Sequence, residues 1–206
     1  MLINNIIRIL KSYKLHLFVI MLFEITNIIK GFKGNKYHFS KNNSMSDDIP
    51  CPYYFLFKIN NIIKNYKVKT FLDLGSGSGR IIDYFNKKLA RKKFIGIEFY
   101  RSQFDYCKSI FNKSKNIKIY NKDFTKINLS KYKSDCIFLN NPFRKESNFL
   151  KFFSNNRIKL FNEKLVVLVN YDKKILKLIK NIKIISIYYI NKNKGFIIIR
   201  VLKNKK

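Results

Sequence analysis

Apolar runs and amphipathic stretches alternate along residues 50–206, which predicts a sheet covered by helices. Short apolar runs predict strands at residues 71–74, 93–97, 116–120, 136–139 and 164–170. Stretches with helical spacing of apolar residues lie at 53–66, 81–89, 147–160 and 172–181. Two final apolar runs, 183–190 and 195–202, flank a polar tetrapeptide that is typical of a hairpin. This order predicts an α/β fold, with a doubly wound, Rossmann-like, seven-stranded sheet ending in a C-terminal antiparallel hairpin.

The first 49 residues show a different pattern. Apolar side chains recur at helical spacing within residues 1–33, at Ile6, Leu10, Tyr13, Leu17 and Ile20. The segment that follows is polar and predicts a linker. We therefore expect an N-terminal amphipathic helical segment and linker at 1–49 and a separate α/β domain at 50–206. The apolar helix face is expected to pack on that domain, and contact with an anionic membrane surface is the alternative.

Residues 71–80, Phe-Leu-Asp-Leu-Gly-Ser-Gly-Ser-Gly-Arg, predict a strand, a tight glycine loop and the start of a helix. Glycines allow positive φ angles and let a ligand approach the backbone, and a helix start offers free N–H groups to an anion. Arg80 occupies the position of the third glycine in the dinucleotide fingerprint, which disfavours a nicotinamide cofactor. The pattern of a P-loop is also absent.

The pattern D-x-G-x-G-x-G resembles motif I of the class I S-adenosylmethionine (SAM) methyltransferases. In that family the loop backbone holds the methionine part of SAM, and the acid lies close to its amino group. The resemblance therefore implies contacts to the cofactor from Asp73, Gly75, Ser76, Gly77 and Gly79.

Acidic residues also end the second predicted strand and follow the third. Glu98 comes about 20 residues after the loop, where a carboxylate can accept both ribose hydroxyls. The family resemblance implies that Asp123 accepts the adenine amino group, and Phe124 is a candidate to pack on the adenine ring. The chain has only 12 acids in 206 residues, so an acid near each of three consecutive strand ends favours one shared cofactor site.

Asn140-Asn141-Pro142-Phe143 follows the fourth predicted strand and resembles the N/D-P-P-Y/F motif of amino-group methyltransferases. The same strand also resembles its counterpart in the non-SET histone lysine methyltransferases. The resemblance implies that Asn140 orients the target nitrogen and also lies at the cofactor, and that Phe143 packs on the substrate. The sequence departs from the motif at Asn141, where the family has proline. A plain asparagine–proline turn is the alternative interpretation.

A further resemblance covers residues 50–201. Small bacterial class I methyltransferases of unassigned substrate share the Pro-x-Pro-Tyr element at 50–53, the glycine loop, an Asn-Pro-Phe after the fourth strand and a later strand ending near Asn-Tyr. It suggests that Tyr53 covers the cofactor.

The net charge of +31 favours a polyanionic partner, which is RNA, DNA or an anionic membrane. Of the 43 basic residues, 36 are lysines spread along the chain, which also fits a solvated basic surface without a specific partner. The cysteines (51, 107 and 136) are far apart and both histidines (16 and 38) precede the loop, so we expect no metal site. Isolated, reduced thiols suggest a cytoplasmic protein.

The resemblances together imply a SAM-dependent methyltransferase whose acceptor is a nitrogen of a protein side chain. The first alternative is methylation of RNA or DNA bases, which the basic charge favours. The second is a membrane-bound or partner-bound module in which the SAM fold is vestigial. No general base is evident, which fits catalysis by orientation of the acceptor.

Overall fold

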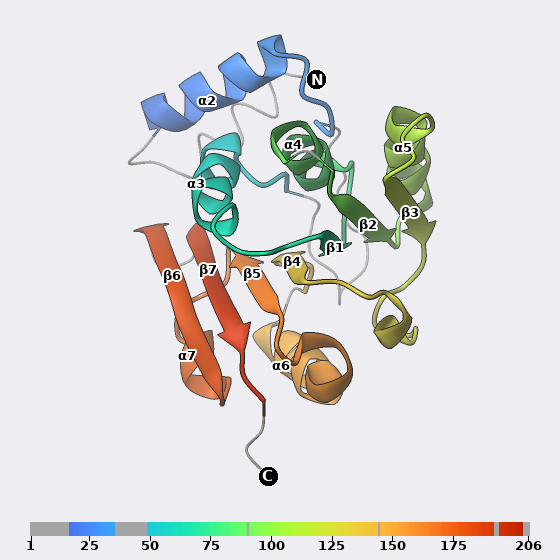
Figure 1. The fold of residues 1–206 in the computed structure, drawn as a ribbon. Helices are drawn as coiled ribbons and strands as arrows, with labels where there is room; N and C mark the ends of the chain where they lie inside the picture. The colour runs from blue at the N-terminus through green and yellow to red at the C-terminus, as the bar shows by residue number, and fades with distance from the viewer. Residues whose placement is uncertain (1–16, 36–48, 90, 144, 192–193, 204–206) are drawn as a thin grey trace.

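The computed structural model describes residues 17–35, 49–89, 91–143, 145–191 and 194–203, and within these ranges one seven-stranded sheet forms the centre of the molecule (Figure 1). The strand order is β3-β2-β1-β4-β5-β7-β6. The strands are β1 (Thr70–Leu74), β2 (Lys93–Glu98), β3 (Ile117–Asn121), β4 (Cys136–Asn140), β5 (Leu165–Val169), β6 (Ile182–Asn191) and β7 (Lys194–Val201). The first five are parallel, and β7 runs antiparallel between β5 and β6. The predicted doubly wound sheet with its terminal hairpin is confirmed.

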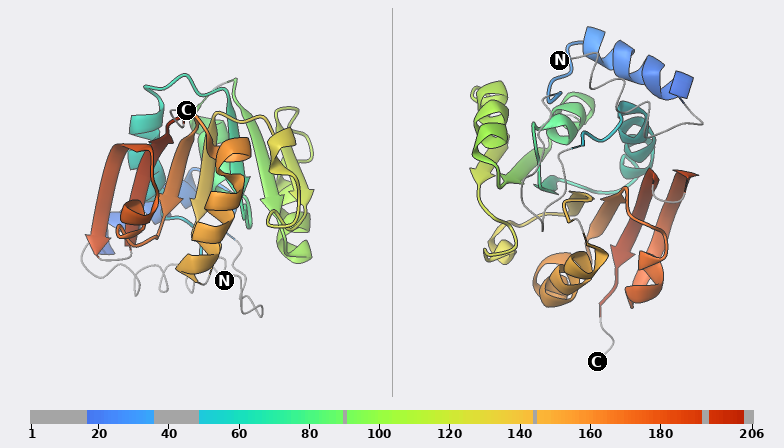
Figure 2. Two further views of the ribbon diagram at one scale, coloured as in Figure 1. Left: turned by 90° about the horizontal axis from the view of Figure 1, so that it is seen from below. Right: turned by 180° about the vertical axis from the view of Figure 1, so that it is seen from behind.

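Helices cover both faces of this sheet (Figure 2). They are α2 (Leu17–Ile29), α3 (Tyr53–Ile63), α4 (Arg80–Lys88), α5 (Arg101–Phe111), α6 (Glu146–Asn156) and α7 (Ile175–Leu178). Helices α3, α4 and α5 pack on one face, and α6 and α7 pack on the other. Helix α2 lies outside this layer and packs on α3.

Three helices differ from the sequence prediction. Helix α5 was not predicted, although it packs against the glycine loop. Helix α6 ends at Asn156, and a single π-helical turn, Arg157–Phe161, completes the predicted segment. Helix α7 has only four residues, which makes it much shorter than the predicted helix at 172–181.

The alternation of side chains along β1 divides the core into two layers. Phe71 stacks on Phe85 and Phe94 on the α4 side, with ring centroids 5.7 and 5.1 Å apart, respectively. Leu72 belongs to the apolar cluster on the α6 side. Successive strand residues point to opposite faces, so both layers form around the same strands. The strand order reverses between β1 and β4, and ligands of open α/β sheets bind at the carboxyl edge of such a point.

Helix α2 is joined to the rest of the protein through its inner side. Ile20 is fully buried there, and the Phe23 ring lies 5.2 Å from the Tyr54 ring of α3. The expected helical positions Ile6, Leu10 and Tyr13 lie outside the described residues. None of the helices in the described ranges has the length and apolarity needed to cross a membrane.

Candidate cofactor site

The loop after β1 is built on three glycines in left-handed conformations. Gly75, Gly77 and Gly79 have φ angles of 78°, 52° and 86°, which side-chain-bearing residues rarely adopt. A Cβ on Gly79 would also lie 2.6 Å from the Cys107 sulfur, because α5 packs directly against the loop. A Cβ on Gly75 would lie 3.2 Å from the Pro142 side chain. The loop therefore lies between α5 on one side and the segment after β4 on the other.

Glu98 fastens this loop to the end of β2. One carboxylate oxygen accepts the Gly77 N–H at 2.7 Å, and the other accepts the Tyr100 N–H at 2.7 Å. Burial raises the pKa of Glu98, although the hydrogen bonds from the backbone N–H groups oppose that shift. A carboxylate oxygen can accept two hydrogen bonds, so the Glu98 carboxylate can still accept hydrogen bonds from ribose hydroxyls. Glu98 thus has a loop-holding role that the sequence did not reveal.

Arg80 is buried beside the loop and joins it to the N-terminal segment. Its guanidinium pairs with Glu24 of α2 at 2.7 Å, and the two side chains are only 3% and 2% exposed. It also donates to the carbonyl of Cys51 at 3.3 Å and to the side chain of Asn35 at 2.7 Å. Burial opposes the charge of Arg80, but Glu24, together with Tyr53 and Cys51, offsets that effect, and the pKa of Arg80 is raised. A buried cation with these partners joins α2, Asn35 and Cys51 to the start of α4.

Residues 33–35 lie directly on the glycine loop. The Ser78 hydroxyl donates to the Gly34 carbonyl at 2.7 Å, and a Cβ on Gly34 would lie 2.3 Å from the Arg80 nitrogen. The Tyr53 hydroxyl donates to the carbonyl of Lys33 at 3.2 Å, and its ring centroid is 4.4 Å from the Arg80 guanidinium carbon. Tyr53 is fully buried among these groups. The structure therefore gives Tyr53 different contacts from those predicted: it supports Arg80 instead of facing an open cofactor site.

Asp73 is buried at the carboxyl end of β1, as a motif I acid should be. A small cavity of about 20 Å³ lies beside the loop, lined by Pro50, Cys51, Gly75, Ser76, Ser78, Arg80, Ile81 and Asn140. The Ser76 hydroxyl is buried and, among the described residues, has no hydrogen-bond partner. A buried polar atom of this kind at a glycine loop fits a site that is completed by a polar ligand.

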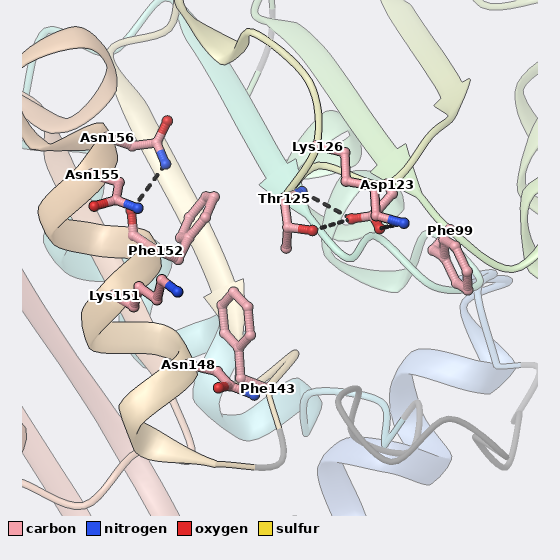
Figure 3. A pocket seen from close by; sticks show the side chains of 10 residues that line it. All are labelled: Phe99, Asp123, Thr125, Lys126, Phe143, Asn148, Lys151, Phe152, Asn155 and Asn156. Carbon is pink, nitrogen blue, oxygen red and sulfur yellow. Dashed lines mark hydrogen bonds and ion pairs between the residues drawn. The ribbon is translucent and has the colours of Figure 1, made fainter.

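A larger cavity of about 360 Å³ opens between the loop after β3 and helix α6 (Figure 3). Phe99 and Asp123 line one side, and Phe143 lines the other. One Asp123 oxygen accepts hydrogen bonds from the N–H and the hydroxyl of Thr125, which fixes the carboxylate. The predicted Phe124 is buried and does not line this cavity; its ring packs edge-on against Phe143, with centroids 5.6 Å apart. Phe99 was missed, although it is an aromatic residue directly after the acid at the end of β2.

The segment after β4 differs from the amino-group methyltransferase motif in its backbone. Asn141 has a φ angle of 41°, whereas a proline ring holds φ near −65°. The side-chain amide of Asn140 donates to the Ile49 carbonyl at 2.7 Å, and its oxygen accepts from the Asn170 amide at 3.3 Å. The orientation of the Asn140 amide is thereby fixed. The turn at Asn141 therefore differs from the turn of the motif, because the proline that the motif has at this position cannot adopt a φ angle of 41°.

Within the described ranges, no three His, Cys, Asp or Glu side chains lie together where they could hold a metal ion. The cysteines at 51, 107 and 136 are all buried, and none of the three forms a disulfide. His16 and His38 lie outside the described residues.

The sheet order, the terminal hairpin and the glycine loop at the point of reversal define the class I methyltransferase fold. A family model described as "Methyltransferase domain" matches residues 65–205, and the chain belongs to this family. No curated protein matches the chain significantly in sequence.

Solved structures share the fold at low sequence identity. An RNA methyltransferase from Salinibacter ruber, solved with S-adenosylhomocysteine, is 14% identical, with a TM-score of 0.57 over 76% of this chain and 96% of that chain. The O-methyltransferase TomG from Streptomyces achromogenes, solved with SAM, is 11% identical, with a TM-score of 0.58 over 76% and 83%. Fibrillarin from Aeropyrum pernix, also solved with SAM, is 14% identical, with a TM-score of 0.51 over 64% and 66%. These similarities establish the fold.

Proposed function

We propose that the protein is a SAM-dependent methyltransferase that transfers a methyl group to a nitrogen of a protein side chain. The observation that carries the cofactor assignment is the glycine loop, held by Glu98 and bearing the buried Ser76 hydroxyl, next to a cavity that ends at Asp123. The family match and the SAM-bound or S-adenosylhomocysteine-bound structures of similar fold support it.

The residues divide between the two ends of the cofactor. Asp73, Ser76 and the loop backbone bind the methionine part, and Glu98 accepts hydrogen bonds from the ribose hydroxyls. Asp123 accepts the adenine amino group in the larger cavity, where Phe99 and Phe143 offer aromatic surface. When bound, SAM supplies an electrophilic methyl group on its sulfonium sulfur.

The methionine part needs more room than the loop cavity offers. About 20 Å³ is enough for about one water molecule. Pro50 and Cys51 form one wall of this cavity, and Asn140 holds the preceding Ile49 by a hydrogen bond of 2.7 Å. Cofactor binding therefore shifts residues 49–51 away from the loop, and it frees the Asn140 amide from Ile49.

Asn140 supports nitrogen as the acceptor atom. It lies at the carboxyl end of β4, beside the loop cavity, and its side-chain oxygen is oriented by Asn170. An amide oxygen accepts hydrogen bonds, so it can bind an N–H of a neutral amine and point the nitrogen lone pair at the methyl group. Catalysis then rests on positioning and on the exclusion of water.

RNA is the second candidate acceptor. Lys126 and Lys151 lie on opposite sides of the larger cavity, and the exposed Phe99 ring lies on the same side as Lys126. Lysines bind phosphates, and exposed aromatic rings stack on unpaired bases.

Calorimetry with SAM tests the cofactor assignment. We expect micromolar binding that Glu98→Ala weakens by about 100-fold, because hydrogen bonds to a carboxylate are lost. Glu163→Ala removes the same charge at an exposed site before β5 and should leave affinity unchanged. Equal affinities for the wild type and both variants would reject the assignment.

Transfer of labelled methyl groups into fractionated lysate tests the acceptor. Label in protein that is lost with Asn140→Ala supports the proposal, and label in RNA supports the second candidate. Label in lipid or small molecules only would contradict both.

A further inference from the structure

Helix α2 presents a line of apolar side chains on its outer side. Phe18, Leu22, Ile25 and Ile29 are 67%, 46%, 38% and 79% exposed, respectively. Their spacing of four, three and four residues places them on one side of the helix. We name these four residues the α2 stripe. Large aliphatic and aromatic groups aligned in this way mark an interaction site, unlike isolated exposed apolar residues.

The α2 stripe is not needed to hold the helix on the protein. The inner side of α2 does this through Ile20, Asn27 and the Glu24–Arg80 pair, all of which are buried. The apolar surface continues onto α3, where the exposed Phe57 ring lies 5.2 Å from the Phe23 ring. Among the described residues, the outer side of α2 therefore stays exposed.

The charge of the N-terminal segment and of the two lysines that follow α2 favours an anionic partner. Residues 1–33 contain five basic residues and one acid, and that acid, Glu24, is buried in its pair with Arg80. Lys30 and Lys33 are exposed directly after the helix. A second copy of the chain carries the same net charge of +31 and is repelled. A nucleic-acid backbone offers no apolar surface to four such side chains.

We propose that the α2 stripe docks the protein on an anionic lipid bilayer, with α2 in the plane of the membrane surface. The four apolar side chains enter the boundary between headgroups and acyl chains, and nearby lysines bind anionic headgroups. The stripe does not form part of the cofactor site, so docking and SAM binding are separate properties.

The composition of the chain allows a direct test, because it contains no tryptophan. Phe18→Trp places a single fluorescent reporter in the stripe. Leu178→Trp is the matched control, since Leu178 is 58% exposed on α7, at the other end of the molecule (Figure 1). With vesicles that contain phosphatidylserine, we expect a blue shift and quenching by brominated acyl chains for Phe18→Trp only. Equal responses of both reporters would overturn the proposal, because they would show unspecific attraction of a basic protein.

A second variant replaces all four stripe residues with serine. We expect its partition onto the same vesicles to fall by about 100-fold or more, with an unchanged circular dichroism spectrum. Binding equal to that of the wild type would overturn the proposal. The proposal would also be overturned if the wild type did not bind vesicles but associated with itself, and if the serine variant did not self-associate. That result would show that the stripe contacts a second copy of the chain. Calorimetry with SAM on the same variant separates this result from the proposed function.

Discussion

Because the Glu24–Arg80 pair is buried, we expect replacement of one Glu24 carboxylate oxygen by an amide nitrogen to lower the free energy of unfolding substantially. Glu24→Gln keeps the shape of the side chain but leaves the Arg80 charge without its carboxylate. Loss of one partner from a buried ion pair costs about 3–5 kcal/mol. Arg80 retains hydrogen bonds to Cys51 and Asn35, and the amide oxygen of the substituted side chain can still accept the Tyr53 N–H. We therefore expect the lower end of that range, about 3 kcal/mol.

Urea denaturation followed by circular dichroism measures this difference, with Asp105→Asn as the matched control. Asp105 pairs with Arg101 at 2.9 Å, but the two side chains are 52% and 74% exposed. An exposed pair of this kind contributes about 0.3–0.5 kcal/mol. A loss for Glu24→Gln no larger than that for Asp105→Asn, at an unchanged urea dependence of the free energy of unfolding, would refute the reasoning.

Three further outcomes follow from the loop and its neighbours. Gly79→Ala should lower the free energy of unfolding by about 2–4 kcal/mol, because the new Cβ would contact Cys107. Gly31 also has a positive φ angle but has open space around it, so Gly31→Ala should lower the free energy of unfolding by only about 1 kcal/mol in the same denaturation assay. Asn141→Pro restores the family motif but should reduce methyl transfer, since proline cannot adopt a φ angle of 41°, and Asn141→Gly should retain it. SAM affinity measured by calorimetry should fall as the pH drops through the raised pKa of Glu98, because the protonated carboxyl binds ribose hydroxyls less well. Glu98→Gln should remove that pH dependence, and a pH dependence shared by both proteins would contradict the assignment.

The order of apolar runs was sufficient to predict the sheet and the position of the glycine loop. Each parallel strand is a short apolar run that ends near a polar residue, and β5 is apolar throughout because it is buried on both faces. Helix α5 was not predicted, because its buried side includes the polar Gln103 and therefore interrupts the apolar pattern that is formed by Phe104, Cys107 and Phe111. The short α7 shows that helical spacing alone can overestimate the length of a helix, since only four of the ten residues predicted to be helical at 172–181 form it.

The candidate site was predicted in its residue types but not in all of its contacts. Glu98 ends β2 and Asp123 follows β3, as the sequence predicted, and the structure adds a cavity beside Asp123 that the sequence did not predict. Phe99 lines the cavity, whereas the predicted Phe124 is buried beside it. Which of the two rings faces the cavity depends on the direction of the backbone after each strand, and the spacing of residues along the chain does not specify that direction. Likewise, the hydrogen bond from Gly77 to Glu98 joins residues 21 positions apart, beyond the reach of a local pattern.

Arg80 links the sequence motif to the N-terminal part of the protein. At the sequence level it only argued against a dinucleotide, by standing where that fingerprint has glycine. In the structure its partners Glu24, Asn35 and Cys51 all precede residue 65, where the family match begins. A chain reduced to the matched part would retain every glycine of the loop but leave the Arg80 charge without its carboxylate, at the start of the helix that follows the loop. The glycine loop thus lies within the family match, whereas its stability depends on a segment outside that match. That segment also carries the α2 stripe, so in our proposal the same helix supports the loop with its inner side and docks on a membrane with its outer side.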